Sequence, residues 1–238
     1  MAQIADIHSH ILPGLDDGAK DMEESVQMLW QAWQQGITEV VATPHYSFMY
    51  ENICPDRIRA LCKEVQECAR RKLDVDIHIT PGQEIMYSED VVKLLEEGKL
   101  LTMGEGRHVL IEFRPEMPYT HIFRAVKDLV FAGYIPILAH AERYRAIREP
   151  GKAEELKAQG ALIQLNFRAV GGKWYHETTR WCRRVLREEI VDFFGTDMHN
   201  ISERRPDTKG AVEWMKKSLD EEYVERALWK NGHELTKA

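Results

Sequence analysis

The chain has 238 residues, of which 44% are hydrophobic, and its formal net charge is −7. A chain of this length can bury one large core, and an acidic balance with mixed charges argues against a nucleic-acid-binding protein. It has no apolar run of 18 residues, so no transmembrane helix and no stable membrane insertion are predicted. We expect a single domain over residues 1–238.

The cysteines and the N-terminus indicate the cellular compartment in which the protein is expected. The chain contains four cysteines, Cys54, Cys62, Cys68 and Cys182. Their spacing fits neither a zinc knuckle nor a dense disulfide framework, so reduced thiols are the simplest interpretation. The N-terminus has no basic flank and no signal-type apolar segment. Together these features predict a cytoplasmic protein.

Short apolar runs alternate with longer amphipathic segments along the chain. Runs rich in Val, Ile and Leu are typical of strands buried on both faces of a parallel sheet. Seven strands are predicted: 4–10, 39–45, 76–84, 108–113, 135–142, 161–167 and 190–199. Between them, apolar residues recur at helical spacing. Helices are predicted over 21–35, 55–72, 88–98, 120–132, 151–159, 176–189 and 208–231.

This alternation favours a barrel or a doubly wound sheet, in which active sites lie at the carboxyl ends of the strands. Histidines and acidic residues lie at six of the seven strand ends. In chain order they are His8, His10, Asp16, Asp17, His45, Glu84, Glu112, His140, Asp197 and His199. His8 and His10 share one face of their strand. The strand 161–167 offers only Asn166.

Burying so many carboxylates together would be prohibitive without compensating cations. Metal ions are the obvious cations, since neutral imidazole and carboxylate groups bind them. Asp17, Glu84, Glu112 and Asp197 with the five histidines make nine donors, too many for one ion, so two or three ions are predicted, some of them bridged by a carboxylate. Such sites hold both the attacking and the leaving oxygen of a phosphoryl displacement. With no thiolate among the donors, manganese or iron is as plausible as zinc.

Six segments, in order from residue 4 to about residue 206, resemble the PHP (polymerase and histidinol phosphatase) superfamily. They read "DIHSHILPGLDDG", "ATPH", "GQEIMY", "LIEF", "AHAERY" and "TDMHN". They are most similar to its bacterial manganese-dependent protein tyrosine phosphatases of capsular and exopolysaccharide synthesis. The resemblance implies an α/β fold, a distorted (β/α)7 TIM-like barrel of PHP type. It also implies three divalent metal ions, expected to be Mn²⁺, with iron or zinc as alternatives.

The resemblance further implies which strand-end residues hold each ion, with Glu84 bridging the first two ions. The sets are His8, His10, Glu84 and Asp197 for the first ion, Glu84, Glu112 and His140 for the second, and Asp17, His45 and His199 for the third. Asp16 is the alternative to Asp17.

Two arginines would contact the phosphate in the pattern that the resemblance implies. They are Arg143 and Arg205, with Arg204 as the alternative to Arg205. A planar guanidinium suits this role because it binds two phosphate oxygens at once. Tyr46 and Phe48, together with Tyr50, either line an entrance that packs against a phosphotyrosine ring or simply cover the top of the barrel.

The predicted activity is hydrolysis of a phosphomonoester by attack of a metal-bound hydroxide on phosphorus. The resemblance implies a phosphotyrosine protein as substrate, expected to be a bacterial tyrosine kinase of polysaccharide export. A small-molecule phosphatase, acting on histidinol phosphate or a nucleotide, is the second hypothesis. Amidohydrolase-type C–N cleavage ranks third, because no strand ends in a lysine that could bridge two metals. An inactive metal-binding adaptor would be expected to lack a ligand, and none is missing. The sequence predicts neither the general acid nor the oligomeric state.

Overall fold

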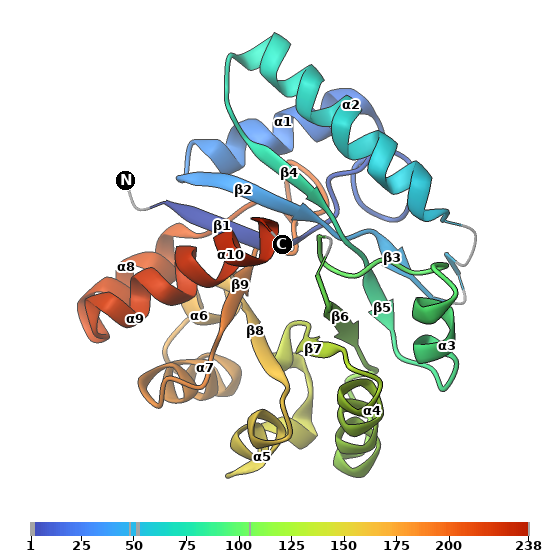
Figure 1. The fold of residues 1–238 in the computed structure, drawn as a ribbon. Helices are drawn as coiled ribbons and strands as arrows, with labels where there is room; N and C mark the ends of the chain where they lie inside the picture. Colours follow the sequence, from blue (N-terminus) through green and yellow to red (C-terminus); the bar gives the residue numbers. More distant parts are fainter. Residues whose placement is uncertain (1–2, 48, 51–52, 105, 238) are drawn as a thin grey trace.

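The computed structural model describes residues 3–47, 49–50, 53–104 and 106–237. Its strands form a curled parallel sheet, and most of the helices lie outside the curl (Figure 1). The strands are β1 (Ile4–Ser9), β2 (Ile37–Ala42), β3 (His45–Tyr46), β4 (His78–Pro81), β5 (Glu84–Met86), β6 (His108–Glu112), β7 (Ile135–Leu138), β8 (Leu162–Asn166) and β9 (Phe193–Gly195). The parallel α/β arrangement confirms the predicted class.

Two of the predicted strands are each divided in two. The run 39–45 overlaps β2 and β3, and the run 76–84 overlaps β4 and β5; β2 starts two residues before its run and β5 ends two residues after its run. Pro44 and Pro81 lie at the two breaks. Because proline has no N–H to donate, it interrupts a hydrogen-bonded ladder. The sheet is therefore in two parts, ordered β1-β2-β4 and β3-β5-β6-β7-β8-β9. An isolated bridge between Ser9 and Met198 links β1 to the segment after β9.

The helices fill the connections between strands, as predicted, with different bounds. They are α1 (Met22–Trp33), α2 (Pro55–Leu73), α3 (Val91–Glu96), α4 (Tyr119–Phe131), α5 (Lys152–Ala158), α6 (Phe167–Gly171), α7 (Glu177–Arg187), α8 (Lys209–Ser218), α9 (Glu221–Glu225) and α10 (Asn231–Lys237). Short 3₁₀ helices span Ala141–Arg143 and Arg145–Arg148, and a π-helical turn spans Arg226–Lys230.

The prediction of one helix over 208–231 is wrong. The chain leaves the helical conformation at Leu219, and α9 starts anew after Asp220. The Asp220 carboxylate accepts hydrogen bonds from the backbone N–H groups of Glu222 and Tyr223. This is an N-cap, which satisfies donors that the first turn of a helix leaves unpaired. The capping aspartate is the sequence signal that the helical periodicity concealed.

The apolar residues pack in two clusters. The larger lies between the sheet and the helices around it. The smaller joins residues of five strands, one residue of the C-terminal helix and two residues outside both. They are Ile7, Val41, Met103, Leu110, Ile137, Ala139, Phe193 and Leu235. Figure 1 shows α10 ending near the centre of the curled sheet. His233 and Thr236 of this helix both bond to the Glu39 carboxylate of β2, at 2.5 and 2.7 Å.

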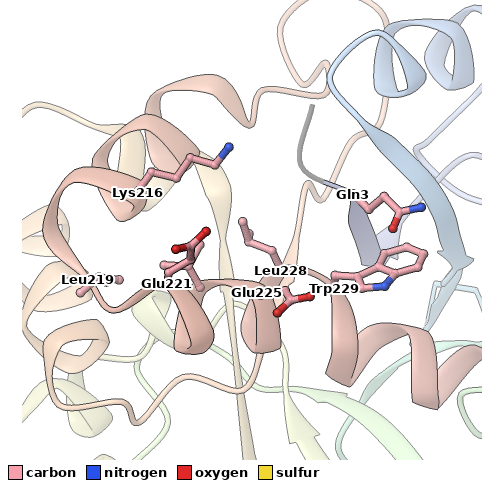
Figure 2. Close-up of a pocket in the computed structure, with 8 residues that line it drawn as sticks. Gln3, Lys216, Leu219, Glu221, Glu225, Leu228 and Trp229 are labelled. Carbon is pink, nitrogen blue, oxygen red and sulfur yellow. The ribbon is translucent and has the colours of Figure 1, made fainter.

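A groove of about 690 Å³ lies beside the start of β1, between α8 and the last helical segments. Figure 2 shows Gln3 and Trp229 on one side of it and Lys216 on the other. It contains none of the predicted site residues. Across the described parts of the chain, no helix is both long and apolar enough to span a bilayer.

Candidate metal centre

The nine side chains predicted as metal ligands come together where the strands end. They form four overlapping groups, and within each group the donor atoms lie within 4.8 Å of one another. The groups are His10, Asp17, His45 and His199; His8, Glu84 and His140; His8, His10 and Asp197; and His45, Glu84 and Glu112. Their elements are far apart in sequence, so the parallel fold is what assembles the cluster.

Glu84, the first residue of β5, lies at the middle of the cluster and is 1% exposed. One of its oxygens, Oε1, is 2.7 Å from His140 Nε2. The other, Oε2, is 3.0 Å from His8 Nε2 and 3.2 Å from His10 Nε2. Despite these approaches, Oε2 makes no well-formed hydrogen bond within the described residues, and neither does His199 Nε2. Buried atoms of this kind are costly unless a partner satisfies them. A divalent cation among these nitrogen and oxygen donors would do so.

The electrostatics favour ionised carboxylates. Burial alone would raise the pKa of Glu84, but the surrounding imidazoles, His8 first, hold it well below its usual range. Burial likewise opposes ionisation of Asp197, yet His8 and Arg143 keep its pKa low. Burial lowers the pKa of His140, which favours the neutral imidazole that binds metals. The residues therefore fit divalent cations in charge and in donor type.

The structure distinguishes the two aspartates of "LDDG". The Asp16 carboxylate belongs to none of the four donor groups, and its Oδ2 accepts from His10 Nδ1 at 2.8 Å and from the backbone N–H of His45 at 2.9 Å. Asp17 Oδ1 lies 3.4 Å from His199 Nε2 and 3.5 Å from His45 Nε2. Asp17 thus offers an oxygen to the cluster, whereas Asp16 orients His10.

The next residue, Gly18, allows this loop to fold tightly. A Cβ atom at Gly18 would lie 2.2 Å from the carbonyl oxygen of His10. No side chain fits there without displacing the backbone of a candidate ligand. The glycine of "LDDG" is therefore required by the close approach of two backbone segments.

The structure places Arg143 and Arg204 at the edge of the cluster. The Arg143 guanidinium bonds to Asp197 Oδ2. Arg204 Nη2 donates to Asp197 Oδ1 at 2.9 Å, and its Nη1 lies 3.6 Å from Asp17 Oδ2. The Arg205 side chain is exposed and lines a separate surface groove with Gln31. Of the two alternatives at this position, the structure thus brings Arg204 to the cluster and leaves Arg205 outside it.

Asn200 explains why the first of the two arginines returns to the cluster. Its side-chain oxygen accepts from the backbone N–H groups of Ser202 and Arg204, both at 3.0 Å. The backbone N–H of His199 in turn donates to the carbonyl of Arg204 at 2.9 Å. Asparagine favours such turns because its side chain bonds to the backbone a few residues on. The last letter of "TDMHN" was the available signal.

Two candidate ligands have a left-handed backbone. The φ angle is 35° at His140 and 53° at Asp197. A residue other than glycine in this region costs roughly 1–3 kcal/mol, and such residues cluster at functional sites. The surrounding contacts hold both residues in this conformation.

Sequence reasoning missed two polar residues beside the cluster. Gln164, in the middle of β8, is fully buried and contacts His8 and the backbone of His140. Glu142 is also buried, and burial raises its pKa to about 7, although Arg143 opposes the shift. Asn166, considered only as a weak ligand, donates to Asp197. A polar residue inside the apolar run "LIQLN" was the signal for Gln164.

Of the three aromatic residues after the second predicted strand, Tyr46 belongs to β3. The Tyr50 ring stacks on His45 with 5.9 Å between ring centres and an interplanar angle of 12°. Phe48 lies outside the described residues.

The sequence matches a known protein family along nearly its whole length. The profile of the family described as "Capsular polysaccharide synthesis, CpsB/CapC" matches residues 4–237. The chain belongs to the CpsB/CapC family. The tyrosine-protein phosphatase YwqE of Bacillus subtilis (strain 168) is 33% identical over 223 residues, which are 91% of this chain and 85% of YwqE. Membership of the CpsB/CapC family confirms the resemblance drawn from the six segments.

Solved structures extend the comparison. A chain from work on YwqE of Bacillus subtilis and CpsB of Streptococcus pneumoniae, described as unique metal-dependent tyrosine phosphatases, superposes with a TM-score of 0.88. It is 31% identical, over 98% of this chain and 94% of that one. The phosphotriesterase homology protein from Escherichia coli, 11% identical, has a TM-score of 0.63 over 98% of each chain. This CpsB/CapC member thus shares its fold with a chain of very low sequence identity.

Proposed function

We propose that this chain is a metal-dependent protein-tyrosine phosphatase that hydrolyses phosphotyrosine in a protein. One observation carries the proposal: a cluster of nine donors, all but Asp17 and His45 buried, with two guanidinium groups at its edge, where the strands end. Carboxylates and imidazoles suit divalent cations, and guanidinium groups suit the phosphate. YwqE, a tyrosine-protein phosphatase, and the structures described as metal-dependent tyrosine phosphatases support the same activity.

The proposal also specifies the type of barrel and the number and kind of metal ions. The fold is a distorted (β/α)7 barrel of PHP type in one domain over residues 1–238. The cofactor is three divalent ions, with Mn²⁺ as the expected ion and iron or zinc as alternatives. The proposed ligands are those predicted above: His8, His10, Asp17, His45, Glu84, Glu112, His140, Asp197 and His199.

The chain's own residues bind and orient the phosphate. The Arg143 and Arg204 side chains are 42% and 36% exposed, so they can bind a phosphate that arrives from solvent. Their positive charges stabilise the non-bridging oxygens as negative charge redistributes in the transition state. When bound, the ions supply Lewis-acid charge and lower the pKa of a water molecule. A tyrosine phenolate, with a pKa of ~10, leaves without a strong general acid.

The proposed substrate is a bacterial tyrosine kinase of polysaccharide synthesis, and the family description supports this context. No nucleic acid is part of the proposal. A cytoplasmic location is proposed from the cysteines. All four are free thiols, and Cys62, Cys68 and Cys182 are buried.

The test is phosphate release by the Mn²⁺-loaded protein. A phosphotyrosyl peptide is compared with histidinol phosphate, each with and without a chelator, and H140A serves as the variant expected to be inactive. Chelator-sensitive release that favours the peptide supports the proposal. A preference for histidinol phosphate would replace the protein substrate with a small molecule. Release that persists in H140A would contradict the proposed site, and no release from either substrate would contradict phosphatase activity.

A further inference from the structure

β8 contributes no predicted metal ligand, yet it lies between β7 and β9, whose ends carry His140 and Asp197. Gln164 and Asn166 are two positions apart on this strand, so their side chains lie on the same face of it. Gln164 is 0% exposed and Asn166 is 7% exposed. These two side chains are candidates for a role in the metal centre other than ligation.

The direction of the hydrogen bonds around Gln164 follows from one donor. The backbone N–H of His140, which can only donate, lies 2.6 Å from Gln164 Oε1. This contact identifies the oxygen of the amide, an assignment that hydrogen-bond partners must decide. His8 Nδ1 lies 3.2 Å from the same oxygen. Because Oε1 can only accept, His8 must carry a proton on Nδ1.

This proton position determines what His8 presents to the cluster. In a neutral imidazole with Nδ1–H, the lone pair is on Nε2. His8 Nε2 points to the centre of the cluster, 3.0 Å from Glu84 Oε2 and 3.7 Å from Asp197 Oδ1. Gln164 therefore selects the tautomer in which His8 can bind a metal.

The chain of bonds continues to Asp197. Gln164 Nε2 can only donate, and it lies 2.9 Å from Asn166 Oδ1. The amide of Asn166 then presents Nδ2 to Asp197 Oδ2, at 2.9 Å. Asp197 Oδ2 thus bonds to Asn166 and Arg143, while Oδ1, which accepts from Arg204, faces the imidazoles of His8 and His10 at 3.7 and 3.6 Å.

Gly195 makes room for this arrangement. It pairs with Asn166 in the ladder between β8 and β9. A Cβ atom at Gly195 would lie 2.5 Å from the Cβ of His8 and 3.0 Å from Gln164 Nε2. Only a glycine lets β1 and the Gln164 side chain approach this closely.

We propose that Gln164 is a positioning residue of the metal centre. Through its two acceptor bonds and its donor bond to Asn166, it orients ligands that come from β1, β7 and β9. The inference rests on the proposed metal-binding function. Removing a partner that orients a metal ligand typically lowers metal affinity 10–100-fold.

The test measures Mn²⁺ binding in the full chain, with the apparent Kd from competition with a chelating dye and the metal content from elemental analysis. We expect Q164L to bind Mn²⁺ about 10–100-fold more weakly than the wild-type chain. Q164E restores acceptors for His8 and His140 and should recover part of the loss. The matched control is Q66L. Gln66 lies on α2, and its Oε1 also accepts a hydrogen bond from a backbone N–H, that of Ile79, at 2.6 Å.

The outcomes separate the two proposals. Wild-type affinity and metal content in a folded Q164L would overturn the positioning role while leaving the metal centre intact. If the wild-type chain binds no Mn²⁺, the proposed function fails and the positioning role fails with it. If Q164L does not fold, N166A replaces it: it removes the acceptor of Gln164 Nε2 and the donor to Asp197, and it keeps the bonds of Gln164 Oε1 to His8 and His140. We then expect about tenfold weaker binding, and unchanged binding would overturn the inference.

Discussion

Arg204 and Arg205 are chemically identical neighbours with different surroundings. Arg204 contacts Asp197 and Asp17, whereas the Arg205 side chain is exposed outside the cluster. We predict that R204A lowers kcat for a phosphotyrosyl peptide about 10²–10³-fold, the usual effect of losing one charge-stabilising donor. R205A is the matched control and should stay within about twofold. Equal losses in both variants, or a larger loss in R205A, would contradict this assignment.

Glu142 gives a pH-dependent prediction. Its pKa is raised to about 7 by burial, so between the ordinary carboxyl value and pH 7 the folded state binds more protons than the unfolded state. Glu142 therefore stabilises the fold fully at low pH, and this contribution is lost as the pH rises through 7. E142Q removes the titration. We expect its stability relative to wild type to rise by roughly 2–3 kcal/mol from pH 4.5 to pH 8, since one pKa unit corresponds to ~1.4 kcal/mol.

The measurement is urea unfolding of the metal-free chain and of the metal-free E142Q variant across this pH range. Glutamine keeps an acceptor for the backbone N–H of Asn166, which lies 3.4 Å from Glu142 Oε2. A stability difference that does not change with pH would show that Glu142 has an ordinary pKa.

At the scale of elements, the C-terminal helix α10 closes part of the sheet's interior. Leu235 packs in the smaller apolar cluster with residues of five strands and is 2% exposed. We predict that L235A lowers the free energy of unfolding by about 2–5 kcal/mol, because it leaves a cavity among strand residues. The check is urea denaturation of the chain. The control is F131A on α4, whose side chain is 96% exposed and should contribute within about 0.5 kcal/mol. A similar small effect in L235A would mean that α10 does not support the sheet.

For the whole molecule, stability should depend on the metal. The cluster keeps Glu84 and Asp197 ionised although both are buried, so cations that bind the folded state alone stabilise it. At a free Mn²⁺ concentration of 100 Kd, one site contributes about 2.7 kcal/mol. For a chain of this size that is a Tm increase of roughly 5–10 °C per site. Calorimetry with and without a chelator tests this, and an unchanged Tm would contradict a metal centre built from these residues.

Much of the fold could be predicted because parallel strands buried on both faces read as continuous apolar runs. Each of the nine strands overlaps one of the seven runs, and the two extra strands arise where Pro44 and Pro81 interrupt two of the runs. The helix over 208–231 was predicted wrongly because its periodicity continues past Asp220, where local capping ends one helix and starts another. Periodicity reports which face is apolar, not whether the backbone turns.

The sequence by itself determined the family, and it predicted which side chains come together at one edge, because strand ends in a parallel fold converge there and the residue types at these ends are those that metals prefer. It put Asp17 before Asp16 and Arg205 before Arg204, whereas the structure brings Asp17 and Arg204 to the cluster. The two residues of each pair differ by only one position in their spacing to every motif. The turns at Gly18 and Asn200 decide which side chain of each pair faces the cluster. The tertiary structure also decided the role of Gln164. Two of its three partners, His8 and His140, come from other segments, so these hydrogen bonds exist only once the sheet has curled.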